Sequence, residues 1–160
     1  MRRASFEDMN CSIARALEVV GEWWTLLVLR DAFLGITRFD DFRERLGIAR
    51  NVLTSRLDTL VAAGVLERRP YDEARKRYDY VLTPMGRGLL PVMITLRQWG
   101  DDWLTGEGSE PTLLHHTTCR TTTRGVLTCE HCGEPLLPRT VRAVPGPGET
   151  DPDFIPARAR

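Results

Sequence analysis

Apolar residues in the first 64 positions recur every three or four residues, the spacing that places side chains on one face of a helix. The pattern predicts four short helices. The second, Glu22 to Phe33, is apolar nearly all round and is therefore expected to be the buried central helix. Thr37 and Asp40 resemble a capping box at the start of the third. The glycines that end these helices are Gly21, Gly35, Gly47 and Gly64.

The fourth helix is predicted over residues 49–63 and has two distinct faces. A tight turn at Gly47 precedes it, and three short helices joined in this way form a helix-turn-helix pattern. The apolar face consists of Leu53, Leu57, Leu60 and Val61, and the polar face of Asn51, Thr54, Ser55 and Asp58.

The hydrophobic period changes after the fourth helix. Residues 65–69 and 78–82 are predicted to form two short strands, with the polar segment DEARKR as the tip between them. A helix-turn-helix followed by such a β-hairpin is a winged helix.

One long helix is expected after the hairpin. Thr83 and Pro84 are typical of an N-cap and a first helical residue. The apolar periodicity then continues to about Leu104. Pro91 lies inside this run and is expected to kink the helix or to weaken one hydrogen bond.

Net charge changes the picture only when it is divided by segment. The 22 basic and 22 acidic side chains cancel, which taken alone argues against a nucleic-acid-binding protein. Residues 37–87, however, carry eleven basic and eight acidic groups, a net +3, and residues 88–114 carry one and four, a net −3. All basic side chains but Lys76 are arginines, which suit phosphate and base edges. A general bias toward arginine codons explains that choice equally well.

The polar face of the fourth helix is a candidate DNA-reading surface. Arg50 and Asn51 lie at its N-terminal end, and these residue types can pair bidentately with guanine and adenine in the major groove. Thr54 and Ser55 suit bases or phosphates. The alternative is an ordinary solvated helix face beside a charged hairpin tip that blocks edge aggregation. The basic hairpin residues that would neutralise phosphates or reach a minor groove are Arg75, Lys76 and Arg77.

Residues 11–103 resemble the HxlR-type winged-helix regulators, which are related to the MarR-like group. The matching motifs are Cys11, Gly21-x-x-Trp24, Arg38-Phe39 with Phe42 and Leu46, Asn51 to Leu57, Ala63 to Leu66, and Tyr80 to Gly86. The resemblance implies a homodimeric, DNA-binding repressor or activator, and brings Arg38 and Arg56 into the expected DNA-binding set. Two positions depart from the family pattern. Ala49 cannot cap the fourth helix, at a cost of roughly 1 kcal/mol. Trp23 stands where a basic residue is common, and a core role is expected for it, with a surface position at an interface or a ligand pocket as the alternative.

The apolar stripe of the long helix is expected to pair with a second copy of the chain, which would place two reading helices ~34 Å apart. The alternative is that the stripe packs only on its own domain. Cys11 opens the first helix, where the helix dipole stabilises anions; it is a candidate interface residue or a redox sensor. The expected interface comprises Cys11, Leu89, Met93, Leu96, Trp99 and Trp103.

The spacing His116-x2-Cys119-x9-Cys129-x2-Cys132 supplies four soft ligands for a structural, tetrahedral Zn²⁺ site. Arg120 stands where such a turn prefers glycine, and His115 and His131 are competing ligands. The alternative is a reduced or disulfide-linked tail that holds no metal.

These features predict an α+β, mainly α fold: a winged helix-turn-helix with a long C-terminal dimerisation helix and a small β-rich Cys/His tail like a zinc ribbon. The expected division is 1–105, 106–143 and a Pro/Gly-rich, flexible 144–160. No stretch reaches the roughly 18 apolar residues of a membrane span, and no secretory signal is evident, so a cytoplasmic location is expected.

The expected function is sequence-specific transcriptional regulation through double-stranded DNA, with a small-molecule or oxidant effector as a further partner. A protein–protein adaptor is the alternative. An enzyme is not expected, because no free nucleophile lies beside a base and no phosphate loop is present.

Overall fold

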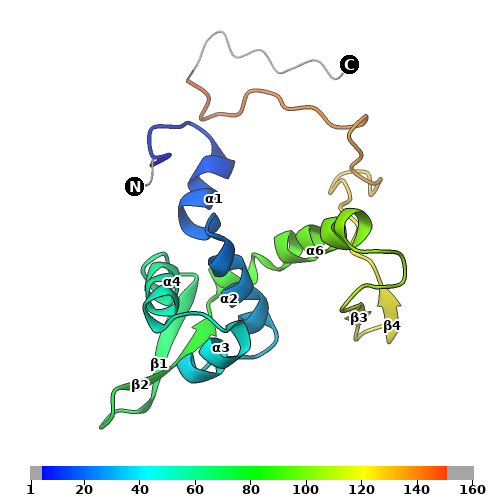
Figure 1. The fold of residues 1–160 in the computed structure, drawn as a ribbon. Helices are drawn as coiled ribbons and strands as arrows, with labels where there is room; N and C mark the ends of the chain where they lie inside the picture. Colours follow the sequence, from blue (N-terminus) through cyan, green and yellow to red (C-terminus); the bar gives the residue numbers. More distant parts are fainter. Residues whose placement is uncertain (1–4, 151–160) are drawn as a thin grey trace. The chain divides into compact units, whose positions relative to one another are not determined.

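The structure is a computed structural model that describes residues 5–150. The chain divides into a first unit that ends at Gly100 and a second unit that begins at Asp101. Helices and strands follow in the order α1 (Ser12–Val20), α2 (Trp23–Phe33), α3 (Phe39–Leu46), α4 (Arg50–Ala62), β1 (Leu66–Asp72), β2 (Arg77–Leu82), α5 (Pro84–Arg87), α6 (Leu90–Leu104), β3 (Leu114–His116) and β4 (Thr121–Thr123) (Figure 1). The described helices include none with the length and apolarity needed to cross a membrane.

The core of the first unit forms around α2, which packs against α1, α3, α4 and β2. This confirms the central position predicted for that helix. Trp23 is an exception: its side chain is 77% exposed, so the core role expected for it is wrong. Trp23 is the first residue of α2 and precedes the helical turns whose side chains are buried. The fully buried apolar side chains of the described residues are Val28, Leu29, Phe42, Leu53, Leu57, Leu60, Val65 and Leu66.

Asp31 of α2 is fully buried and lies between two arginines. Its Oδ1 accepts a hydrogen bond of 2.9 Å from Arg30 Nε, and its Oδ2 lies 3.4 Å from Arg45 Nε on α3. A buried carboxylate is costly unless it is paired. The pairing with Arg45 therefore links α2 to α3.

The capping box expected at Thr37 and Asp40 does not form. Arg38 is the N-cap residue of α3, and no side chain caps this helix. The Thr37 hydroxyl instead donates a hydrogen bond of 2.8 Å to Asp79 Oδ1 on β2. A partner distant in sequence has replaced the local one.

The turn between α3 and α4 forms as predicted. Gly47 has a φ of +63°, a left-handed conformation that side chains disfavour. The chain then enters α4, which presents its leucines to the core. Val65 N bonds to Leu60 O after Gly64 (φ +74°), and the chain passes into β1.

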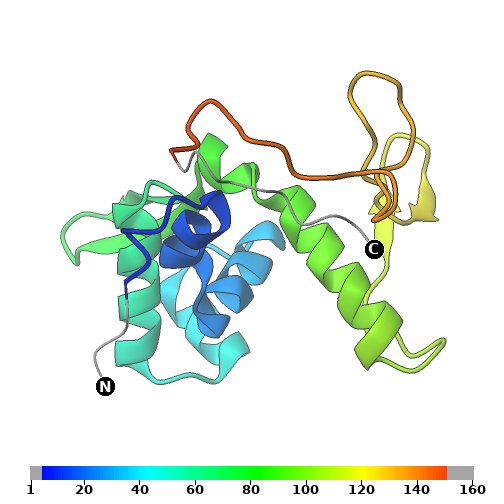
Figure 2. The ribbon, with the colours of Figure 1, turned by 90° about the horizontal axis from the view of Figure 1, so that it is seen from above.

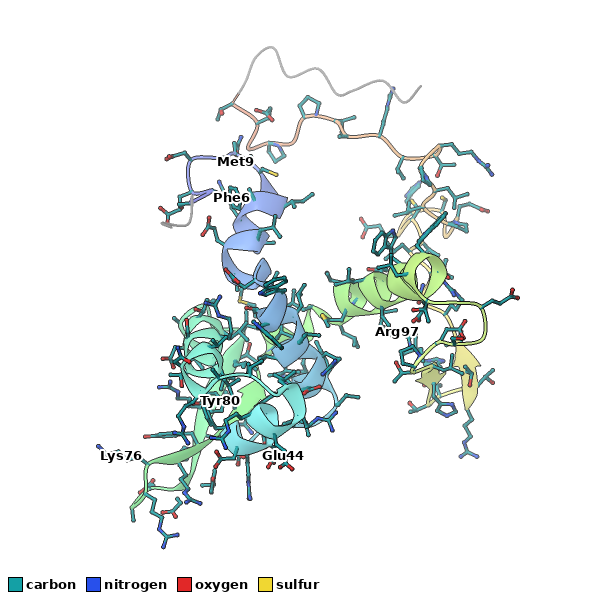
Figure 3. All side chains as sticks on the ribbon, viewed as in Figure 1. Phe6, Met9, Glu44, Lys76, Tyr80 and Arg97 are labelled. Atoms are coloured by element: carbon teal, nitrogen blue, oxygen red, sulfur yellow. The ribbon has the colours of Figure 1, made fainter. Side chains whose placement is uncertain are left out.

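The wing is the antiparallel hairpin of β1 and β2, with Leu66 opposite Leu82 at its base. Its register shifts between Pro70 and Asp72. Figure 3 shows Tyr80 at the base of the hairpin and Lys76 at its far tip. Tyr80 is buried, so the base of the wing belongs to the core and the tip extends into solvent.

The single long helix expected after the wing is two helices. Thr83 caps α5 as predicted and accepts a hydrogen bond from Gly86 N. The chain then turns at Gly88, and α6 begins at Leu90. Pro91 is therefore in the first turn of α6, where a missing N–H costs nothing. The expected kink is absent from α6, which runs unbroken in Figure 2.

The second unit contains the short hairpin of β3 and β4 and an isolated bridge between Thr128 and Pro135. None of its described side chains, residues 101–150, is buried. Residues 144–150 form no helix or strand. The disorder expected for the last 15 or so residues falls mostly on 151–160, outside the described residues.

Candidate nucleic-acid interface

The outer face of α4 is polar, continuous and accessible. The leucines of this helix are buried on the opposite face, because they fill the core beneath α2. One shallow depression runs along the outer face. It is lined by Arg50, Asn51, Thr54, Ser55, Asp58 and Thr59, four of which the sequence predicted to be DNA-binding residues.

Arg50, at the start of α4, lies close to two residues of α3. Its guanidinium lies 5.1 Å from the centre of the Phe39 ring and 3.8 Å from Asp40 Oδ1. Both partners come from the first turn of α3. Ala49 provides no side-chain cap, as the sequence predicted, so the first N–H groups of α4 have no side-chain partner at that position.

Arg56 differs from the other predicted reading residues because it turns toward α2. Its side chain is 21% exposed, and its Nη1 lies 3.7 Å from Glu22 Oε2. The structure thus places Arg56 between α4 and the start of α2. It does not line the depression formed by the outer face.

Asp58 is an acidic side chain on the outer face that the sequence analysis did not connect to a partner. It forms an ion pair and hydrogen bond with Arg68 of β1. The guanidinium of Arg68 also lies 5.7 Å from the centre of the Tyr80 ring. The pair links α4 to the wing and offsets the negative charge of Asp58.

The wing tip exposes Arg75, Lys76 and Arg77. Asp72 closes the tip: its Oδ1 accepts a hydrogen bond of 3.1 Å from Arg75 N, and its Oδ2 lies 3.9 Å from Arg75 Nε. The cationic groups are thus held at the end of a short, closed loop.

Arg38 lies where α3 meets the wing. Its guanidinium is 4.7 Å from the centre of the Tyr71 ring, and its Nε is 3.9 Å from Asp79 Oδ1. Sequence reasoning missed Tyr71. The available signal was an aromatic residue in an otherwise polar part of β1.

The five expected dimer-interface residues that follow the wing fall into two groups. Leu89 and Met93 pack against the core of their own unit. Leu96, Trp99 and Trp103 are exposed on α6, which has no buried residue. The outer side of α6 therefore presents unpaired apolar surface.

The start of α1 is also exposed. Ile13 and Leu17 lie at the surface, although helical periodicity favours an apolar face there. Cys11 is the N-cap residue of α1, is half-buried and forms no side-chain cap hydrogen bond.

The four expected metal ligands occur as two pairs. His116 Nδ1 lies 3.2 Å from Cys119 Sγ. Hydrogen bonds from the backbone of Cys132, then of His131, and from the Cys132 side chain lower the pKa of the Cys129 thiol. Among residues 5–150, no three His, Cys, Asp or Glu side chains lie close enough to hold one metal ion. All four cysteines are free thiols.

Comparisons with known proteins agree with this architecture. Residues 19–107 match the model of the HxlR-like helix-turn-helix family. The chain is 46% identical over 137 residues to an HTH-type transcriptional regulator of Mycobacterium bovis, covering 86% of this chain and 87% of that protein.

Two solved structures are similar to this chain. PA1607, a proposed transcription factor, has a TM-score of 0.78 and 34% identity, over 88% of this chain and 99% of that one. The redox regulator HypR in its reduced form has a TM-score of 0.54 and 29% identity, over 57% of this chain and 92% of that one. The matched residues, the winged helix-turn-helix and these relatives lead to one conclusion: the chain belongs to the HxlR-like helix-turn-helix family and is a transcriptional regulator.

Proposed function

We propose that the chain regulates transcription as a homodimer that binds a partly palindromic operator, with α4 in the major groove. The outer face of α4 is the observation that carries this proposal. It is polar along its whole length, whereas the leucines behind it are fully buried. A major groove admits one helix and offers a distinct hydrogen-bonding pattern at each base pair.

Arg50 and Asn51 are the residues that read bases in this proposal. They occupy the first turn of α4, the part of a recognition helix that usually meets base edges. The Arg50 guanidinium lies beside Phe39 and Asp40 and its side chain is largely exposed, so it is accessible to a guanine. Thr54 and Ser55, one turn further on, contact bases or phosphates.

The wing contributes affinity without reading sequence. Arg75, Lys76 and Arg77 neutralise phosphates or enter the minor groove. The ion pair of Asp58 with Arg68 joins α4 to the wing. The two surfaces therefore approach one duplex together.

In this proposal, specificity comes from dimerisation. The net charge of +3 on residues 37–87 is too small to give strong DNA binding by itself. The exposed side chains of Leu96, Trp99 and Trp103 on α6 are the apolar surface that a second copy would bury. Two reading helices then contact half-sites about 34 Å apart.

A selection from random-sequence duplexes tests the proposal. We expect a two-fold symmetric consensus, two chains per duplex, and an affinity that falls steeply as salt concentration rises. Recovery of no consensus, together with binding that is insensitive to salt, would contradict it and favour a protein–protein adaptor.

A second candidate function is regulation by oxidation of Cys11. The residue is half-buried at the start of α1, beside the exposed Ile13. The similar structure HypR is a redox regulator. Treatment with peroxide should change operator affinity in the unaltered chain and leave Cys11→Ser unchanged, with reversal by dithiothreitol. An equal response of both chains would assign the effect to other groups.

A further inference from the structure

The second unit builds the same turn twice. His116 pairs with Thr121 across a four-residue turn. Thirteen residues later, Cys129 N donates a hydrogen bond of 2.8 Å to Glu134 O across a turn of the same length. Each turn carries a metal-ligating residue at its start and a cysteine three residues later.

The two turns share a backbone conformation as well as the spacing of their His and Cys residues. The residue after each second cysteine has a positive φ, +56° at Arg120 and +76° at Gly133. Glycine adopts this region freely, whereas a branched or long side chain does so at a cost of order 1 kcal/mol. Arg120 thus takes the conformation that the first turn requires, although glycine would be the easier residue. Such a retained strain is typical of a functional turn.

The side chains converge within the first turn. His116 Nδ1 and Cys119 Sγ are 3.2 Å apart. Nitrogen and sulfur ligands of tetrahedral zinc are separated by about 3.5 Å, given bond lengths near 2.0 and 2.3 Å. Adjacent residues of a strand point to opposite faces, so His115 on β3 faces away from this pair. The structure therefore favours His116 over His115 as the ligand.

The described part of the second unit has no apolar core that could account for its folded structure. Residues 101–150 include no buried side chain, and apolar residues such as Val126 and Leu127 are more than half exposed. A unit of this size usually needs disulfides or a metal to fold. All four cysteines are free thiols, so disulfides do not supply the constraint.

We propose that the second unit binds one Zn²⁺ ion through His116, Cys119, Cys129 and Cys132, and that this site replaces a hydrophobic core. Three thiolates and one imidazole form a set that suits tetrahedral zinc. The two pairs do not form a larger ligand group within the described chain. Metal binding must therefore draw the two turns together, and it is coupled to the folding of this unit.

Elemental analysis of the full-length chain, purified without chelator or oxidant, is the first test. We expect one zinc per chain. Cys119→Ser and Cys129→Ser should lose it, and His116→Ala should lose it to a chelator that leaves the unaltered chain loaded. His115→Ala, His131→Ala and Cys11→Ser are matched controls that should keep it.

Replacement of zinc by Co²⁺ provides a readout that does not depend on any variant. The spectrum should show thiolate-to-metal charge transfer and the intense visible bands of a tetrahedral site. Limited proteolysis should cut residues 105–145 faster after chelation, while the first unit resists.

The proposal is overturned by a zinc-free chain with four titratable thiols or with a disulfide among Cys119, Cys129 and Cys132. An octahedral cobalt spectrum, or zinc retained by Cys129→Ser, also contradicts it. Loss of metal from His115→Ala but not from His116→Ala overturns the ligand assignment.

Discussion

The hydroxyl of Thr37 donates a hydrogen bond of 2.8 Å to Asp79 Oδ1, which lies on β2, 42 residues later in the chain. Tyr80 N also donates to Thr37 O at 2.7 Å. These two bonds attach the base of the wing to the segment that precedes α3. The bonds therefore hold the wing against the start of α3, which the turn at Gly47 joins to α4.

Thr37→Val should destabilise the first unit by about 1 kcal/mol, because it removes the hydroxyl but keeps the shape of the side chain. Urea unfolding of Thr37→Val, Asp79→Ala and the double variant measures the coupling between the two residues. Additive effects in this cycle would show that the bond contributes nothing.

Asn51→Ala should weaken operator binding by about 1–3 kcal/mol and relax the preference at one base pair of each half-site. The side chain lies on the exposed face of α4, so the free energy of unfolding should be unchanged. Titration against duplexes that each differ at one base pair measures both effects. A uniform loss across all duplexes would place Asn51 on the backbone instead of a base.

Arg75→Ala with Arg77→Ala should weaken binding to all sequences equally. The slope of log affinity against log salt should fall by about 0.9 for each lost phosphate contact. Arg139→Ala with Arg142→Ala, two exposed arginines of the second unit, is the matched charge control. If the control flattens the slope as much as the wing variant does, total charge and not the wing is responsible.

Leu96→Glu and Trp99→Glu should each give a monomer in place of the proposed dimer. Both side chains are exposed on α6 in the single chain, the proposed interface would bury them, and a buried carboxylate is costly. Light scattering and sedimentation measure the mass. Val141→Glu, at another exposed apolar position, should remain dimeric. Dimers that persist in both α6 variants would move the interface away from this helix.

Gly86→Ala should destabilise the first unit by roughly 1–3 kcal/mol. A Cβ at this position would lie 2.2 Å from the carbonyl oxygen of Val65, a backbone atom that has little room to move. Gly146→Ala, where a Cβ meets nothing within 4 Å, is the control. Thermal unfolding followed by circular dichroism gives the comparison, and equal midpoints for Gly86→Ala and the unaltered chain would refute the close packing of α5 on Val65.

Hydrophobic periodicity predicted the winged helix-turn-helix because local burial dominates there. The spacing of Leu53, Leu57 and Leu60 leaves only one face of α4 for the core, so its polar face must be outside. The turn glycine Gly47 could be found in the same way, because its left-handed conformation is a local requirement. Likewise the spacing of the two Cys/His pairs was visible in the sequence, whereas the positive φ that Arg120 and Gly133 share was not.

Only the tertiary structure decided which partner each polar side chain takes. Thr37 bonds to Asp79 instead of capping α3, and Arg56 turns to Glu22, because these partners come from elements distant in sequence. The long helix divides at Gly88, and the residue before the break that lies against Val65 is Gly86. Periodicity reports which side chains are apolar, but the partner of a hydrogen bond or an ion pair is selected by three-dimensional proximity, which no short window of sequence contains.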